Sequence, residues 1–100
     1  MDALYDEALA RFSDVFTEAQ RQNLNEPAAM TLATVDAHGQ PAARTVLLKH
    51  FDARGFVFYT NTHSRKGQHL DAHPKAALCF FWQPLMQQIL VEGIAARVTD

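Results

Sequence analysis

Apolar residues in the first part of the chain recur with the spacing of an α-helix. Between Asp2 and Gln22 they form one stripe, which consists of Leu4, Tyr5, Ala8, Leu9, Phe12, Val15, Phe16 and Ala19. Such a stripe predicts an amphipathic helix that buries one face against the rest of the protein. Pro27 follows shortly afterwards, and because proline cannot continue a helix, we expect the helix to end before it.

The period then changes from helical to strand-like. β-Branched and aromatic residues are enriched in three segments, Ala29–Val35, Pro41–Phe51 and Phe56–Thr60, which predicts three strands. The connections Asp36–Gly39 and Asp52–Gly55 both end in glycine, a residue suited to the left-handed backbone of a hairpin turn. We therefore expect these strands to form an antiparallel meander.

The rest of the chain predicts a short helix and two more strands. The polar segment Ser64–His73 is ended by Pro74 and is typical of one or two helical turns. Lys75–Trp82 and Gln87–Val98 then have strand character, with a loop between them. This order favours a mainly β fold with flanking helices, in which antiparallel strands form a barrel or a sheet covered by the first helix. The sequence offers no long crossover helices, GxGxxG motif or P-loop, which argues against a parallel doubly wound sheet.

The size and the charge of the chain limit the kinds of ligand that it can bind. The chain has 100 residues, 48% of them hydrophobic and 20% charged, so we expect residues 1–100 to form a single domain. A chain of this size buries about two-thirds of its unfolded surface, so any large ligand must bind at the surface or between subunits. The net charge is −2 and the cations are dispersed, which argues against nucleic acid but allows a small anion such as a phosphate monoester.

The cellular setting follows from the single cysteine and from hydropathy. Cys79 has no second cysteine to pair with, so a reducing cytoplasm is expected. Its apolar neighbours favour a buried packing role over a reactive thiol. The sequence has neither an apolar stretch near the ~20 residues that a membrane helix needs nor a basic signal region after Met1, so we expect a cytoplasmic protein without a membrane partner.

The segment Tyr59–Lys66 is the strongest local indication of chemistry. It places hydroxyl groups and two cations, Arg65 and Lys66, where a predicted strand leads into a predicted helix. Free N–H groups at a helix start, together with adjacent cations, form a cradle for phosphate. The alternative is an N-cap by Ser64 with solvated surface charges.

Two further features suggest ligand contacts. Arg44 and Lys49 bracket an apolar strand, and because they are five positions apart, they should point to opposite faces unless a β-bulge intervenes. Arg44 and Lys49 either contact different groups of a ligand or are only surface charges of the strand. Gln88 begins the last strand near Trp82, and its amide could pair with both a carbonyl and an N–H group of a flat heterocycle.

The sequence gives little support for a metal site or for acid–base catalysis. The histidines lack the spacing of a metal site, since His69 and His73 are four apart without an evident third ligand. The sequence also contains no recognisable nucleophile–base motif. We therefore predict neither a metal nor a catalytic acid–base residue.

Several separated motifs together resemble the pyridoxamine 5'-phosphate oxidase family. The likeness runs from about Glu26 to Val98 and includes Pro74, Phe81, Trp82 and Gln88. The longer motifs that carry it, in order, are Ala29–Asp36, His38–Pro41, Arg44–Lys49, Gly55–Asn61 and Ser64–Lys66.

The resemblance implies an FMN-binding split β-barrel in which two subunits hold the flavin between them. It also implies a flavin oxidoreductase of vitamin B6 metabolism (pyridoxine biosynthesis) that oxidises pyridoxine or pyridoxamine 5'-phosphate to pyridoxal 5'-phosphate, with dioxygen as the acceptor. In that family a hydride passes from the substrate to the flavin, so the lack of an acid–base motif is expected.

The site residues implied by the resemblance lie between Arg44 and Gln88. Lys49 would contact both the flavin and the substrate phosphate. The FMN contacts would be Arg44, Thr45, Val46, Leu47, Leu48, Lys49, Tyr59, Thr60, Arg65, Lys66 and Gln88.

Members of this family are longer, so the resemblance also implies an incomplete barrel with an edge strand open to pairing with another chain. Two alternatives remain open because a fold does not fix a function. One is an enzyme of the same fold with another substrate. The other is a flavin- or haem-binding module, or a dimerisation domain, without catalysis.

Overall fold

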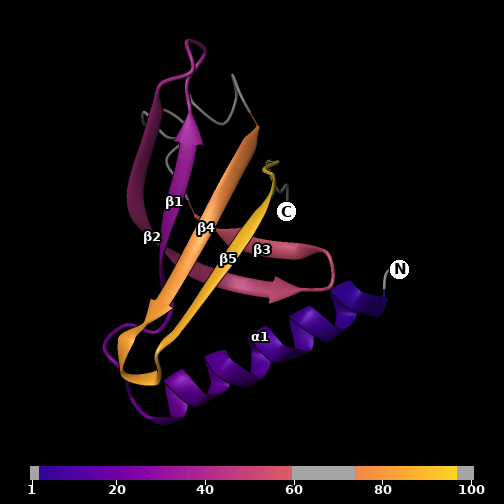
Figure 1. Ribbon diagram of the computed structural model, residues 1–100, viewed down its shortest axis with the longest axis vertical. Coiled ribbons are helices and arrows are strands. Elements are labelled where there is room, and N and C mark those ends of the chain that lie inside the picture. The colour runs from indigo at the N-terminus through magenta and orange to yellow at the C-terminus, as the bar shows by residue number, and fades with distance from the viewer. Residues whose placement is uncertain (1–2, 60–73, 97–100) are drawn as a thin grey trace.

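The fold is an antiparallel sheet with one long helix against it (Figure 1). The computed structural model describes residues 3–59 and 74–96. Its elements are the helix α1 (Ala3–Arg21), the strands β1 (Ala29–Val35), β2 (Pro41–Asp52), β3 (Gly55–Phe58) and β4 (Lys75–Trp82), the short 3₁₀ helix η1 (Gln83–Leu85) and the strand β5 (Gln87–Ile94).

The sheet consists of two hairpin pairs joined by a short ladder. Its strand order is β3-β2-β1-β4-β5, and every neighbouring pair is antiparallel. β1 pairs with β2 over its whole length, and β4 pairs with β5 over its whole length. By contrast, β1 pairs with β4 only over Thr31–Ala33. The result is a curled half-barrel whose two hairpins separate at one end (Figure 1).

A β-bulge at Lys49 bends β2 where it pairs with the edge strand β3. The register between β2 and β3 shifts between Leu48 and His50. One extra residue in a strand bends it and reverses the alternation of faces, so Leu48 and Phe51 both pack toward the core. Figure 1 shows the last part of β2 turning away from β1 to run with β3 near α1. The bulge thus bends this part of the sheet toward the helix.

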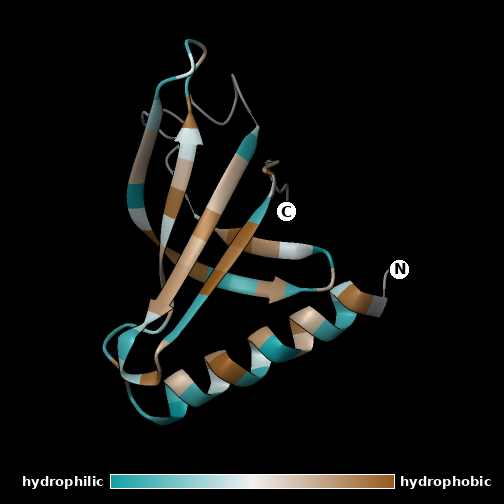
Figure 2. Cartoon of the chain, in the orientation of Figure 1, coloured by the Kyte–Doolittle hydropathy of each residue, from teal (hydrophilic) through white to brown (hydrophobic). Residues whose placement is uncertain are grey.

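The core lies between α1 and the concave face of the sheet. Phe12 of α1 is 4% exposed. Its ring contacts five others, those of Phe16, Phe51, Phe56, Phe80 and Trp82. Figure 2 shows apolar residues recurring along α1 among polar ones. The helix therefore packs on the sheet through the predicted apolar stripe.

The ends of the elements have local causes. Asn23, two residues after the end of α1, takes a left-handed φ of 54°. The N–H of Leu24 bonds back to the carbonyl of Ala19 at 3.2 Å, which is a common way to end a helix. In the β1–β2 hairpin, Gly39 has a φ of 85°, where glycine avoids the strain of a side chain. The predicted helix end and hairpin turn are confirmed.

Most predicted strands are confirmed, with differences at their ends. The Phe56–Thr60 strand is shorter as β3, and the Gln87–Val98 strand ends at Ile94 as β5. The predicted short helix Ser64–His73 lies outside the described residues. The expectation that Cys79 is buried was wrong, because alternation places its neighbours in the core and leaves Cys79 half-buried on the other face. Over residues 3–59 and 74–96, no helix has the length and hydropathy to span a membrane.

Candidate cofactor-binding face

The sheet has an inner face toward α1 and a second face that the helix does not cover, here called the outer face. Directly paired residues of neighbouring strands share a face, so the registers trace it across the sheet. One row joins Thr45, Thr31, Cys79 and Leu90. The exposed large apolar residues on this face are Leu47, Phe81, Leu90 and Ile94, and we call them the outer patch.

The predicted flavin contacts of β2 divide between the two faces. Val46 and Leu48 are 8% and 9% exposed and belong to the core, so only their backbone could contact a ligand. Thr45, Leu47 and Lys49 are exposed on the outer face. Because strand residues alternate, every second position in this run reaches the surface.

Arg44 points inward, opposite to Lys49, as the spacing predicts. It pairs with the buried Leu32 across the β1–β2 ladder. Its Nη1 donates to the Leu32 carbonyl at 3.2 Å and to Thr34 Oγ1 at 2.7 Å. Thr34 is only 2% exposed, so this charged side chain helps to satisfy a buried hydroxyl.

Lys49 is the extra residue of the bulge and is held from the side by an aromatic ring. Its Nζ lies 5.4 Å from the centroid of the Tyr59 ring, a favourable distance for a cation–π contact. Lys49 and Leu48 also line a hollow of about 270 Å³ between α1 and β2, together with Phe16, Gln20, Ala28, His50 and Phe51. The bulge thus places Lys49 beside Tyr59 and at the rim of this hollow.

Gln88 lies apart from the β2 residues. It is exposed on the outer face and pairs with Phe81, while β1 and β4 separate its strand from β2. Neighbouring strands are spaced by about 4.8 Å, so the strand of Gln88 lies about 14 Å from β2, measured across the sheet. A ligand that touches both must lie across the outer face or be shared between chains.

The remaining predicted contacts, Thr60, Arg65 and Lys66, lie outside the described residues, as does most of the predicted phosphate cradle. Tyr59, the described residue before them, is 74% exposed at the end of β3. It is therefore accessible to a ligand.

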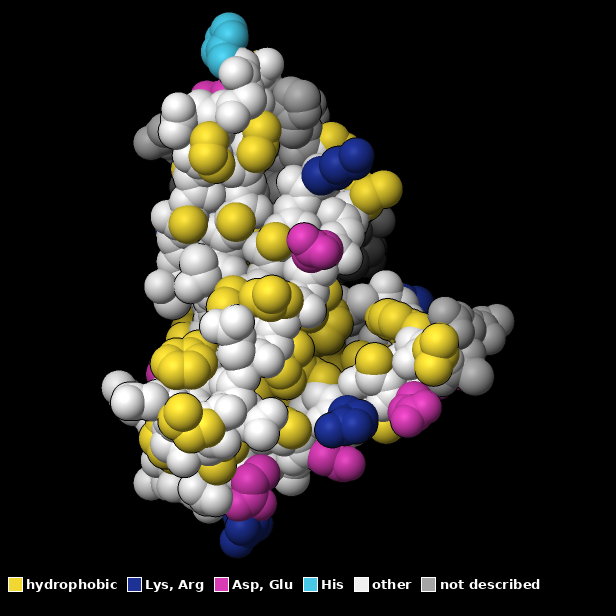
Figure 3. Space-filling view, viewed as in Figure 1, with side chains coloured by type: hydrophobic (Ala, Val, Ile, Leu, Met, Phe, Trp, Pro, Cys, Tyr) yellow, Lys and Arg dark blue, Asp and Glu magenta, His cyan; other side chains and the backbone are white. Residues whose placement is uncertain are grey.

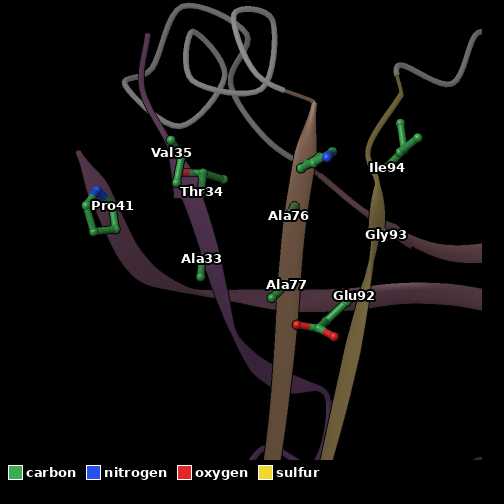
Figure 4. A pocket seen from close by; sticks show the side chains of 10 residues that line it. Ala33, Thr34, Val35, Pro41, Ala76, Ala77, Glu92, Gly93 and Ile94 are labelled. Carbon is green, nitrogen blue, oxygen red and sulfur yellow. The ribbon is translucent and has the colours of Figure 1, made fainter. Parts of the chain in front are cut away.

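A second hollow opens where the two hairpins separate. It measures about 500 Å³ and lies between the ends of β1 and β4, beyond Ala33 and Ala77 (Figure 4). Its walls are mostly small apolar residues, with Lys75 and Glu92 as the charged groups. None of the described residues predicted to bind a cofactor lines this hollow.

Among the described residues, the carboxyl with the most strongly shifted pKa is that of Asp52, at the β2–β3 turn. The side chain of Arg54, then its backbone N–H, and then His50 hydrogen-bond to Asp52 and hold the pKa of its carboxyl far below the ordinary value. The distances are 2.8 Å from Arg54 Nη2 and 3.2 Å from His50 Nε2. This cluster fixes a surface turn. In the part of the chain that the structure describes, no group of His, Cys, Asp and Glu residues is arranged to hold a metal ion.

Comparison with known families identifies the relatives of this chain. A sequence profile described as pyridoxamine 5'-phosphate oxidase matches residues 16–100. The chain belongs to the pyridoxamine 5'-phosphate oxidase family. The match covers all five strands and leaves out the first part of α1.

Relatives within the family include proteins named pyridoxine/pyridoxamine 5'-phosphate oxidase. That of Myxococcus xanthus strain DK1622 is 58% identical over 92 residues, which are 92% of this chain and 45% of the relative. That of Bordetella avium is 60% identical over 89 residues, or 89% of this chain and 42% of the relative. The chain therefore spans less than half the length of these relatives.

Solved structures confirm the split-barrel fold. PhzG from Burkholderia lata, in complex with tetrahydrophenazine-1-carboxylic acid, superimposes with a TM-score of 0.84 at 28% identity, over 94% of this chain and 48% of PhzG. A Nostoc punctiforme protein described as pyridoxamine 5'-phosphate oxidase-related and FMN-binding has a TM-score of 0.71 at 26% identity, over 82% of this chain and 44% of its own. The chain thus forms one half of a family fold that occurs with different ligands.

Sequence reasoning missed two features of this family member. It did not anticipate the outer patch, although the alternation of Phe81 with Phe80 and of Leu90 with Ile89 carried the signal. It also did not predict the hydrogen bond from Arg44 to Thr34, because this contact depends on how two strands pair.

Proposed function

We propose that this chain is the FMN-binding part of an oxidase that converts pyridoxine or pyridoxamine 5'-phosphate to pyridoxal 5'-phosphate, with dioxygen as the acceptor. The observation that carries the proposal is the placement of Lys49, on a bulge of the outer face beside Tyr59, in a chain 58% identical to an oxidase of that name. Lys49 presents a cation to solvent on the outer face, which suits a phosphate ester.

The described residues fit a flat cofactor with an anionic tail. The outer face offers the surface of β2 at Thr45 and Leu47, the ring of Tyr59, and the amide of Gln88 for a heterocycle. In the proposal, Thr60, Arg65 and Lys66 hold the FMN phosphate. When bound, the isoalloxazine would accept a hydride, while this chain binds and orients it.

Arg44, Val46 and Leu48 need a different role in this proposal. Val46 and Leu48 are core residues, and Arg44 is directed to Thr34 on the inner face. Their contacts with FMN would therefore come from the backbone of β2, or from Arg44 after release from Thr34. Lys49 would contact both the flavin and the phosphate of the substrate.

A homodimer with FMN at the subunit interface completes the proposal. Gln88 and the β2 residues are separated by two strands, so two chains could each supply one part of a shared site. The outer patch is consistent with burial against a partner, since large exposed apolar groups mark interfaces. The unpaired Cys79 fits a reducing, cytoplasmic setting.

A titration monitored by flavin fluorescence tests the cofactor assignment. Saturable quenching of FMN, with much weaker binding of riboflavin, is the expected result, because riboflavin lacks the phosphate. Anaerobic addition of pyridoxine 5'-phosphate to the FMN-loaded protein should then bleach the flavin absorbance, and air should restore it. Equal affinity for FMN and riboflavin would contradict a phosphate site.

A second candidate is a flavin- or haem-binding module of the same fold with another substrate or without catalysis. The likeness to PhzG in complex with tetrahydrophenazine-1-carboxylic acid favours it, since that ligand has no phosphate. Binding of FMN without bleaching by pyridoxine 5'-phosphate or pyridoxamine 5'-phosphate would support this candidate over the first.

A further inference from the structure

The ring of Tyr59 lies beside Lys49 on the outer face, directly after β3. The preceding residue, Phe58, pairs with Leu48 and packs against the core, so the alternation of side chains directs Tyr59 to the opposite face. Tyr59 is 74% exposed, and the centroid of its ring lies 5.4 Å from Lys49 Nζ. The contact depends on the bulge, because Lys49 is the extra residue that the register shift leaves out of the β2–β3 pairing.

An exposed lysine needs a partner to keep its ammonium group in one place, because its four-carbon stem is flexible. A carboxylate would hold the ammonium group but would also neutralise its charge. Within residues 3–59 and 74–96, Lys49 forms no ion pair. An aromatic face attracts a cation through its quadrupole and has no net charge of its own. The Tyr59 ring therefore fixes the ammonium group and leaves its full positive charge to an anion.

The carboxylate nearest to Lys49 along the chain is held by other groups. Asp52 accepts hydrogen bonds of 2.8 Å from the side chain and from the backbone N–H of Arg54. His50 Nε2 lies 3.2 Å from the same carboxylate. Asp52 is thus engaged at the β2–β3 turn, and the charge of Lys49 is not neutralised by it.

The charges of the chain are mixed rather than separated by sign. The sequence has nine Lys and Arg residues and eleven Asp and Glu residues, which give a net charge of −2. On the face drawn in Figure 3, positive and negative side chains are interspersed. A general positive field is therefore not available to attract a phosphate, so recognition of a phosphate depends on single cations in fixed positions.

We propose that Tyr59 is a positioning residue, whose ring face holds the ammonium group of Lys49 where this group meets the phosphate of an ester ligand. The inference rests on the proposed function, in which Lys49 contacts the flavin and the substrate phosphate. It gives the Tyr59 ring a part that a contact with the flavin alone does not include. The ring sets the position of the cation, and the phosphate ester, either FMN or the substrate, binds to its charge. The phenol hydroxyl has no part in this contact, so phenylalanine can replace tyrosine.

NMR of the protein without ligand tests the contact itself. An aromatic ring shifts the resonances of protons above its face upfield. The Hε resonances of Lys49 should therefore lie upfield of those of Lys75, an exposed lysine of β4, in the wild type and in Tyr59→Phe. In Tyr59→Leu they should move to the position of an exposed lysine. Titration with inorganic phosphate should perturb the Lys49 resonances at a lower concentration in the wild type than in Tyr59→Leu.

A double-mutant cycle separates positioning of Lys49 from direct contact with the ligand. One arm measures FMN affinity by fluorescence quenching, with riboflavin as the control. The other arm measures the concentration of pyridoxine 5'-phosphate that half-bleaches the FMN-loaded protein without air, with pyridoxine as the control. Tyr59→Leu should weaken the phosphate ester about twofold to fivefold, as expected for an exposed cation–π contact. In the Lys49→Gln background, the same change should have almost no further effect.

Two further variants complete the cycle. Tyr59→Phe should retain most of the affinity, because it keeps the ring face. Tyr5→Leu, at a tyrosine of α1 that is 36% exposed, should leave the affinity unchanged. Circular dichroism of each variant checks that it is folded. The arm in which Tyr59 and Lys49 are coupled identifies the phosphate ester that Lys49 contacts.

Two results would overturn the proposal. The first is a set of Lys49 resonances that Tyr59→Leu leaves unchanged. The second is an effect of Tyr59→Leu that is equal in the wild-type and Lys49→Gln backgrounds for both esters, since Tyr59 would then only contact the ligand directly. A folded wild type that binds no FMN would instead contradict the proposed function. In that case the NMR titration with inorganic phosphate still decides whether Tyr59 positions Lys49 for an anion.

Discussion

Arg44 on β2 donates a hydrogen bond of 2.7 Å to the hydroxyl of Thr34 on β1. The pair lies on the inner face, near the point where β1 parts from β4. Since Thr34 is 2% exposed, its hydroxyl has little access to water. The pair therefore links two strands at the end of the sheet where the β1–β4 ladder is missing.

Loss of this hydroxyl should destabilise the fold. Thr34→Val keeps the shape of the side chain but removes the acceptor, so we expect a loss of about 1.5–3 kcal/mol in the free energy of unfolding. Urea denaturation measures it. Thr34→Ser should retain most of the stability, and Thr31→Val, at an exposed position of the same strand, should change it by less than about 0.5 kcal/mol. Equal effects of Thr31→Val and Thr34→Val would refute a role for the Arg44 contact.

Lys49 should matter more for binding than for stability. The Lys49–Tyr59 contact is exposed, and such a pair contributes about 0.5–1 kcal/mol, so Lys49→Gln should shift the urea midpoint only slightly. In the proposed function the same change removes a cation near the flavin and the substrate phosphate. We expect a clear loss of FMN affinity, measured by fluorescence quenching. Lys75→Gln, at an exposed lysine of β4, is the control, and an equal loss in both variants would argue against a specific role for Lys49.

The phosphate contacts predicted for Arg65 and Lys66 can be separated from general effects on the flavin. Arg65→Ala or Lys66→Ala should weaken FMN binding by about 1.5–3 kcal/mol, or roughly tenfold to a hundredfold, because a charge-assisted hydrogen bond is lost. Riboflavin affinity should stay nearly constant, as measured in parallel titrations. If both ligands weaken equally, neither residue belongs to the phosphate site.

The lowered pKa of Asp52 predicts a pH dependence of stability. A carboxyl whose pKa is depressed in the folded state stabilises the protein above its unfolded pKa of about 3.9, and this contribution is lost as the pH falls toward the folded value. Asp52→Asn should therefore make stability less sensitive to acid between pH 5 and pH 2, roughly the window that this shift affects. Urea midpoints across that range measure the effect.

Arg54→Gln should raise the pKa of Asp52 back toward its ordinary value, because the Arg54 side chain is the largest cause of the shift. NMR titration of the carboxyl follows this change. An unaltered pKa in Arg54→Gln would show that the ion pair is not responsible.

The aromatic core should depend strongly on Phe12. Phe12→Ala removes a ring that contacts five others, and the expected loss is about 3–5 kcal/mol. Since domains of this size have total stabilities of about 5–15 kcal/mol, the variant should be close to unfolding. Phe81→Ala, at a ring 58% exposed on the outer face, should cost far less. Fluorescence of Trp82 during denaturation measures the free energy of unfolding of both variants. An equal loss of stability in Phe12→Ala and Phe81→Ala would place α1 outside the cooperative core.

The sequence predicts the elements well because their causes are local. The stripe of α1, the left-handed residue at Gly39 and the alternation in β1 and β4 all depend on neighbours in the chain. Both β1 and β4 have their predicted bounds.

Long-range arrangements were harder to predict. The bulge at Lys49, the separation of β1 from β4 and the bond from Arg44 to Thr34 depend on which strands pair and in which register. A linear pattern does not contain that information. Alternation did predict that Arg44 and Lys49 face opposite ways, but the core position of Val46 and Leu48 within the predicted site followed only from knowing which face α1 covers.

The hydrogen bond of 3.0 Å from the indole of Trp82 to the carbonyl of Pro27 bears on the order of folding. It joins the start of β1 to the end of β4, with most of the sheet between them in the chain. Closing so long a loop costs entropy before any contact rewards it, and folds dominated by such contacts form slowly. The ring of Phe12 reaches Phe80 and Trp82 only once β4 is in place. During synthesis, the apolar stripe of α1 therefore stays incompletely covered until β4 has left the ribosome.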